Sequence, residues 1–184
     1  SAVCLAFGVC SRGTLGLTSR RLPVVLPRAH DCITLLLGDR HRYDQYTREH
    51  PGTYWYSPGW IECTTMPGKQ RYDKLRAQYV ERYGEDNADF LMESEQHWFG
   101  TYNRATYVSL TVNGDDAHGR QYTRDCADWL GWGYDEQAGD ATLMRDLLGG
   151  RWDDERFLTI PPGGGATLSA DADVVRLKSD GTHD

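Results

Sequence analysis

One stretch, residues 22–38, constrains the fold of this chain more than any other. Residues 22–26 are apolar and include two β-branched valines, which predicts a short buried strand that Pro27 stops. After a polar corner, Asp31 begins a compact apolar helix that Gly38 ends. Aspartate accepts hydrogen bonds from the free N–H groups of a first helical turn, and glycine adopts the left-handed conformation that closes a last one. A strand, a corner and a helix in close succession are typical of an α/β sheet.

The rest of the chain continues this alternation. Apolar or aromatic strand patterns and amphipathic helix patterns follow one another, with no internal repeat and no linker. We expect strands at residues 2–9, 22–26, 53–56, 105–112 and 157–160, and helices at residues 69–83, 86–98, 122–130 and directly after Asp140. The pattern predicts one α/β domain over residues 1–184, a largely parallel open sheet flanked by helices in a Rossmann-like arrangement. Residues 171–184 are acidic and predict a flexible tail.

Composition excludes several classes of protein. The net charge of −7 and the lack of a Lys/Arg run argue against a nucleic-acid partner. No apolar run approaches the roughly 20 residues that cross a bilayer, so we expect no membrane partner and a cytoplasmic location. The chain begins without Met inside an apolar run, which leaves open that it is a fragment, a processed form or a trimmed form of a protein with an upstream segment. The oligomeric state is not predicted, and a pairing with that upstream segment stays open.

Thiols and polar groups follow the ends of several expected strands. The first strand leads to Cys10, the second to His30, Asp31 and Cys32, and the third to Trp60 and Cys63. Because ligands of open α/β sheets bind beyond the carboxyl ends of the strands, we expect these groups to converge at one edge. Thiolate and imidazole suit a transition metal such as zinc or iron. The predicted metal ligands are Cys10, His30, Cys32 and Cys63.

Other residues of the same expected edge predict contacts to a cofactor. Gly163 and Gly164 follow the last strand, and their backbone N–H groups could hold an anion. The predicted cofactor contacts are Arg28, Asp31, Trp60, Gly163 and Gly164. No GxGxxG, GxxxxGK or GxSxG motif is present, which disfavours the familiar nucleotide and serine-hydrolase chemistries.

The five cysteines form no CxxC pair and indicate free thiols, some of them ligands, rather than a disulfide framework. Free cysteine is often simply a small buried apolar residue, and this interpretation is preferred for Cys4 and Cys126. For Cys10 and Cys32 packing and metal or thiolate chemistry both stay open. Cys32 would lie in a first helical turn, where the positive end of the helix favours thiolate over thiol.

The chain resembles a known family in the first third of its sequence and more loosely beyond. The residues that carry the resemblance are Phe7-Gly-Val-Cys10, Gly13, Gly16-Leu17, Val25-Leu-Pro-Arg28, Asp31-Cys-Ile33, Leu36-Leu-Gly38, Tyr43, Pro51-Gly-Thr-Tyr54, Gly59-Trp60, Gly139-Asp140, Trp152, Phe157 and Pro161-Pro-Gly163. They are similar to the bacterial and archaeal DUF1638 family, whose members often accompany corrinoid-dependent methyl-transfer proteins. The resemblance implies a role near metal or corrinoid chemistry, with Cys10, Asp31 and Cys32 at matching positions. This chain lacks the upstream segment expected of the family.

Three functional hypotheses follow. The first is a metal- or metallocofactor-binding protein of one-carbon or methyl-transfer metabolism, acting on a small molecule or with a corrinoid protein. The second is a non-catalytic accessory module that binds a corrinoid or a partner through the aromatic residues 53–60. The third is a thiol redox protein, which requires the Cα atoms of Cys10 and Cys32 to lie within about 7 Å. Whether the protein is an enzyme, and which residues would be catalytic, stays open.

Overall fold

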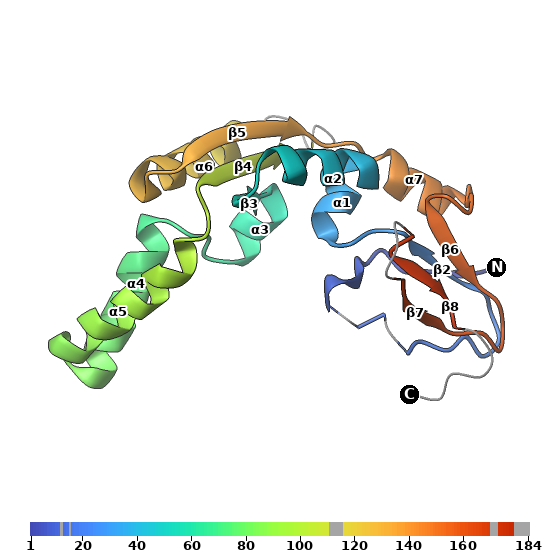
Figure 1. The fold of residues 1–184 in the computed structure, drawn as a ribbon, viewed down its shortest axis with the longest axis horizontal. Coiled ribbons are helices and arrows are strands. Elements are labelled where there is room, and N and C mark those ends of the chain that lie inside the picture. Colours follow the sequence, from blue (N-terminus) through green and yellow to red (C-terminus); the bar gives the residue numbers. More distant parts are fainter. Residues whose placement is uncertain (12, 15, 111–115, 170–172, 179–184) are drawn as a thin grey trace. The chain divides into compact units, whose positions relative to one another are not determined.

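The computed structural model describes residues 1–11, 13–14, 16–110, 116–169 and 173–178 (Figure 1). The chain divides into two compact units. Unit 1 comprises residues 1–44 and 140–184, and unit 2 comprises residues 45–139. Within the described ranges, no helix has both the length and the apolar character needed to cross a membrane. The prediction of one domain over residues 1–184 stays a prediction.

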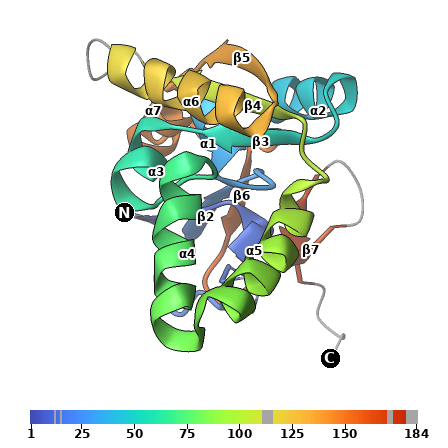
Figure 2. The same ribbon diagram turned by 90° about the vertical axis from the view of Figure 1, so that its left-hand side faces the viewer.

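Unit 2 is built on a parallel sheet flanked by helices, which confirms the predicted α/β class. Its strands are β3 (Thr53–Tyr56), β4 (Arg104–Ser109) and β5 (Gly133–Ala138). They lie in the order β3-β4-β5 and all pair in parallel. The helices are α3 (Pro58–Cys63), α4 (Lys69–Tyr83), α5 (Glu85–Phe99) and α6 (Ala117–Leu130). Figure 2 shows α4 and α5 side by side as an antiparallel hairpin.

The core of unit 2 lies between this sheet and α6. Tyr56 of β3 and Tyr107 of β4 are fully buried there with Cys126 of α6. The Tyr56 hydroxyl donates to the carbonyl of Pro67 at 2.8 Å, so its polar end is satisfied inside the core. Trp60 is half-buried and packs against the same cluster. The aromatic residues around β3 therefore help to complete a core, and Cys126 is buried as expected.

Unit 1 contains a mixed sheet and a two-stranded ribbon. The strands of the sheet are β1 (Val3–Cys4), β2 (Val24–Pro27) and β6 (Phe157–Ile160), and those of the ribbon are β7 (Ala166–Leu168) and β8 (Val175–Leu177). β1 pairs with β2 in parallel, whereas β6 pairs with β2 antiparallel. The helical segments are the 3-10 turn η1 (Val9–Ser11), α1 (Cys32–Leu37) and α7 (Thr142–Gly149). Helix α2 (Arg40–Glu49) begins in unit 1 and ends in unit 2.

Several expected elements differ from the structure. The first strand is shorter than residues 2–9, because the chain leaves the sheet after Cys4 and turns at η1. Residues 58–63 form α3 rather than a loop, since Ser57 caps that helix by accepting from the N–H of Trp60. The polar strand β5 was not expected at all. Within the expected flexible tail, residues 175–177 form β8, and residues 171–172 and 179–184 lie outside the described residues.

A glycine of α6 makes the close packing of this helix on β4 testable. A Cβ atom on Gly119 would lie 2.3 Å from the hydroxyl oxygen of Tyr107. We expect Gly119→Ala to lower the free energy of unfolding by about 1–3 kcal/mol, as overpacking of a core does. Urea unfolding followed by circular dichroism measures the change. Gly59→Ala in α3 is the matched control, because nothing lies within 4 Å of its Cβ position. Equal stabilities of the two variants would contradict this packing.

Candidate functional site

The chain continues to pair with the segment after β2 once β1 has ended. The N–H of Val9 donates to the carbonyl of Ala29 at 3.0 Å, and the N–H of Cys10 donates to the carbonyl of His30 at 2.8 Å. These two bonds hold Cys10 directly beside the corner that leads into α1. Cys10 and Cys32 are thereby brought to the same corner of unit 1, as expected from the sequence.

Gly8 is the residue that allows this approach. It is buried, and a Cβ atom at this position would lie 2.4 Å from the Cα atom of Asp31. Real Cβ atoms do not approach backbone this closely, so any other residue would push the two segments apart. The corner therefore depends on a glycine.

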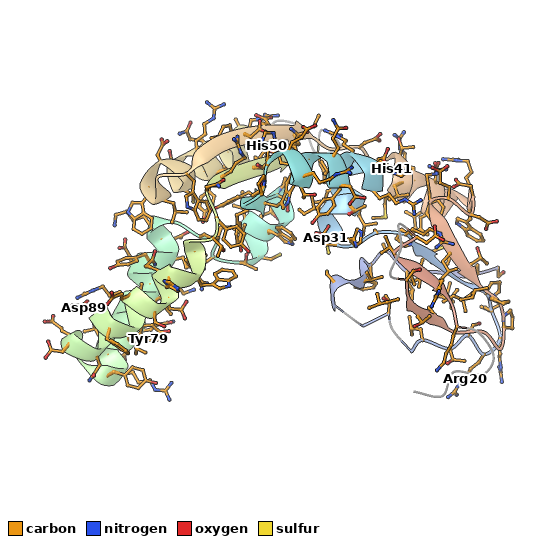
Figure 3. The ribbon with its side chains drawn as sticks, viewed as in Figure 1. Arg20, Asp31, His41, His50, Tyr79 and Asp89 are labelled. Carbon is orange, nitrogen blue, oxygen red and sulfur yellow. The ribbon has the colours of Figure 1, made fainter. Side chains whose placement is uncertain are left out.

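Asp31 organises the start of α1 (Figure 3). Its carboxylate accepts from the N–H of Thr34 at 3.0 Å, so the predicted N-cap is confirmed. Gly38 ends the helix at φ 76° and donates its N–H to the carbonyl of Thr34. The phenol of Tyr43, from α2, also donates to Asp31. Burial, and then this carboxylate, raise the pKa of Tyr43, which stays protonated and acts as a donor.

Cys32 responds electrostatically to the groups around it, Cys10 among them. Although Cys32 is exposed as a residue, partial burial of its sulfur raises the pKa of the thiol above its usual 9.0, and nearby Cys10 and Asp31 raise it further. The backbone N–H groups of Gly8 and of Cys32 itself act in the opposite direction but do not outweigh them. The N–H group at the start of α1 therefore favours the thiolate, as expected, but partial burial and the two neighbouring groups outweigh it and the net pKa of Cys32 is raised.

His30 lies at the same corner with an exposed side chain. Its ring centroid is 6.5 Å from that of Tyr43, with the two planes tilted by 33°. Among the residues that the structure describes, no group of three or more His, Cys, Asp or Glu side chains is arranged to hold a metal ion. The corner brings together two thiols with an imidazole nearby, and the predicted ligand role of His30 stays a prediction.

Arg28 binds main-chain carbonyls of unit 1. Its Nε donates to the carbonyl of Asp154 at 2.9 Å, and its Nη1 donates to the carbonyls of Asp173, at 3.1 Å, and Val175. The side chain thus fastens β8 and the turn before β6 to the end of β2. It also lines a cavity of about 220 Å³ within unit 1. A contact between Arg28 and a cofactor stays a prediction.

The glycines after β6 do not reach this corner. Because β6 is antiparallel to β2, Ile160 pairs with Val24 at the start of β2, and the chain continues away from the end that carries the thiols. The N–H of Gly163 donates to the carbonyl of Ser19, and that of Gly164 donates to the carbonyl of Pro161. The expected convergence of Gly163 and Gly164 on the thiol edge is therefore wrong. Their N–H groups bind backbone oxygens instead of facing an anion.

Cys63 and Trp60 belong to unit 2, and Cys4 belongs to unit 1. Cys63 is exposed at the end of α3 in unit 2, where Trp60 packs into the core. Cys4 packs against the core of unit 1 and donates its Sγ hydrogen to the carbonyl of Leu147 at 3.5 Å, as expected for a packing residue. Cys10 and Cys32 are exposed, which separates them from the two packing cysteines.

Two residues of the corner were not assigned a role from the sequence. Gly8 and Tyr43 appear only among the residues that carry the family resemblance. The residues around Tyr43 do not indicate a contact with Asp31, because this contact depends on the angle between helices α1 and α2. The signal was the presence of both residues in the set that resembles one family.

Comparison with known proteins gives a family and nothing finer. Residues 1–148 match the family described as "Protein of unknown function (DUF1638)". The chain belongs to the DUF1638 family. Neither the curated proteins nor the solved structures contain a match to it. All the corner residues, from Gly8 to Tyr43, lie within the part of the chain that matches DUF1638.

The electrostatics of the corner predict how Cys32 responds to substitution. We expect Cys10→Ser and Asp31→Asn each to lower the pKa of the Cys32 thiol, because each removes a group whose negative charge opposes ionisation. Asparagine also caps helices well, so the second variant keeps α1. The pH dependence of Cys32 alkylation by iodoacetamide, read by mass spectrometry, measures the pKa. Cys63→Ser is the control and leaves it unchanged. An unchanged pKa in both corner variants would show that the three groups do not interact.

Proposed function

We propose that the corner of Cys10 and Cys32 binds a thiophilic metal ion, such as zinc or iron, or the metal of a metallocofactor. The observation that carries the proposal is the hydrogen bond from the N–H of Cys10 to the carbonyl of His30 at 2.8 Å. It brings an exposed thiol beside the turn that bears the second exposed thiol. Thiolate sulfur is the donor that such metals prefer.

Two thiolates supply part of a coordination sphere. In this proposal His30, a small-molecule substrate or a partner protein supplies the remaining ligands. A metal that keeps positions open can bind and activate a substrate thiol or water, whereas a structural zinc is fully enclosed by protein ligands. Tyr43 and Asp31 hold the surrounding backbone, so the thiols are presented on a fixed turn rather than on a loose loop.

The family membership suggests the metabolic setting. The residues that resemble DUF1638 imply a role near corrinoid-dependent methyl transfer, and the corner lies within the family match. We therefore propose a cytoplasmic protein of one-carbon metabolism whose partner is a small methylated molecule or a corrinoid protein. Whether the protein catalyses a step itself is a separate question from whether it binds the metal.

Metal titration tests the proposal directly. We expect the reduced protein to bind one Co²⁺ or Zn²⁺ ion per chain, with a sulfur-to-cobalt charge-transfer absorption for Co²⁺. Thiol protons are released on binding because the ligands are thiolates. Cys10→Ala and Cys32→Ala should each abolish the absorption, whereas Cys63→Ala, which removes an exposed thiol of unit 2, should keep it. Binding that survives both corner substitutions, or no binding by the reduced wild type, would reject the proposal.

The same nearness of the two thiols favours a second candidate, a redox pair. Oxidation would join the Cys10 and Cys32 sulfurs in one disulfide and pass two electrons and two protons to an external disulfide. We expect oxidised glutathione to remove two of the five free thiols from the wild type and none from a Cys10→Ser/Cys32→Ser double variant. Thiol counting with a chromogenic disulfide measures this. Loss of thiols without an intramolecular Cys10–Cys32 link in peptide mapping would rule this candidate out.

A further inference from the structure

Helix α5 exposes two large aromatic side chains on one side, although Trp98 also contacts the rings of Phe99 and Tyr102. Phe90 and Trp98 are 71% and 56% exposed, although both are large aromatic residues. Trp98 lies eight residues after Phe90, seven after the half-buried Leu91 and four after Ser94, so these four residues share one side of the helix. We call this row, Phe90, Leu91, Ser94 and Trp98, the outer stripe.

The inward side of α5 is a different row. Ala88, Met92 and Phe99 are its buried residues. Glu95 pairs with Arg71 of α4 at 3.5 Å, and Asp89 pairs with Arg76 at 2.8 Å. Figure 3 labels Asp89 on this hairpin. A helix that folds by burying one face gains nothing from exposed aromatics on the opposite face. The outer stripe is therefore not required for packing within the hairpin.

The charge of α5 indicates what the stripe can bind. The helix carries five carboxylates and no Lys or Arg: Glu85, Asp86, Asp89, Glu93 and Glu95. Asp89 and Glu95 are bound to α4. Asp86 and Glu93 lie seven residues apart, on one line beside the outer stripe, and have no ion-pair partner among the described residues. The stripe thus presents apolar surface along an acidic edge.

We infer that the outer stripe of α5 binds a basic amphipathic helix of a partner protein. The apolar side of such a helix would cover Phe90, Leu91 and Trp98, and the small Ser94 would let the two helices approach closely. Lys or Arg residues on its flank would pair with Asp86 and Glu93. This surface belongs to unit 2, and the inference is independent of the thiol corner.

A second copy of the chain fits the stripe less well. If two stripes faced each other, Asp86 and Glu93 of both copies would line the same interface. Like charges across an interface are repulsive, and α5 offers only His97 as a basic residue to offset them. A basic partner removes that repulsion, and the charge pattern therefore selects a partner of opposite sign.

A model peptide tests the inference. The probe is a fluorescently labelled 18-residue peptide of Leu and Lys, with Leu at helical spacing, and the control is the same composition scrambled so that the Leu residues share no face. We expect fluorescence anisotropy to show binding of the amphipathic peptide only. Phe90→Ser/Trp98→Ser should weaken it at least about tenfold, because two buried aromatic contacts are lost. Asp86→Asn/Glu93→Gln should weaken it about threefold or more at low salt, and less at high salt.

Matched controls make the outcome decisive. Leu148→Ser removes an apolar residue that is 73% exposed on α7 and should leave binding unchanged. Circular dichroism should show the wild-type helix content in every variant, because the altered side chains are exposed. Equal binding of the scrambled peptide, or undiminished binding by Phe90→Ser/Trp98→Ser, would overturn the inference. So would a wild-type dimer, seen by light scattering, that this double variant dissociates, because a second copy would then occupy the stripe.

Discussion

The candidate site depends on one close approach of two backbone segments, that of Gly8 to Asp31. A side chain on Gly8 would overlap the Asp31 main chain. Without this close approach, the N–H groups of Val9 and Cys10 could not donate to the carbonyls of Ala29 and His30, which follow β2. Parallel pairing of β1 with β2 starts the contact, and the glycine allows it to continue past the sheet. Two cysteines distant in the chain thereby share a corner.

This geometry has an electrostatic consequence. Cys10, Asp31 and Cys32 can each carry a negative charge, and burial makes a charge on Cys32 still less favourable. The backbone N–H groups of Gly8 and Cys32 oppose these effects. A cation bound among the three groups would reverse the sign of their influence on Cys32 and favour the thiolates. Without a bound cation the pKa of the Cys32 thiol is therefore raised, whereas a metal ion bound as proposed would favour the thiolates.

Features that depend on residues close together in the sequence could be predicted. The Asp31 cap, the Gly38 stop and the exact extent of α4 depend on local hydrogen bonds and on helical periodicity. The direction of β6 could not be predicted, because an apolar strand pattern is the same in both directions. The polar strand β5 was missed since its pattern lacks the apolar residues that mark a buried strand. The raised pKa of Cys32 depends on burial and on neighbours that only the folded chain brings near.

The family match and the architecture divide the corner into two parts. The residues that form it, from Gly8 to Tyr43, lie within residues 1–148, whereas β6, β7 and β8 lie beyond the match. Yet β6 pairs along the whole of β2, and Arg28 fastens β8 to the end of that strand. The family match thus includes Cys10, Asp31 and Cys32, the residues of the proposed site. Strand β2, which leads into the corner, is paired on one side with β1 inside the family match and on the other side with β6, which lies outside it.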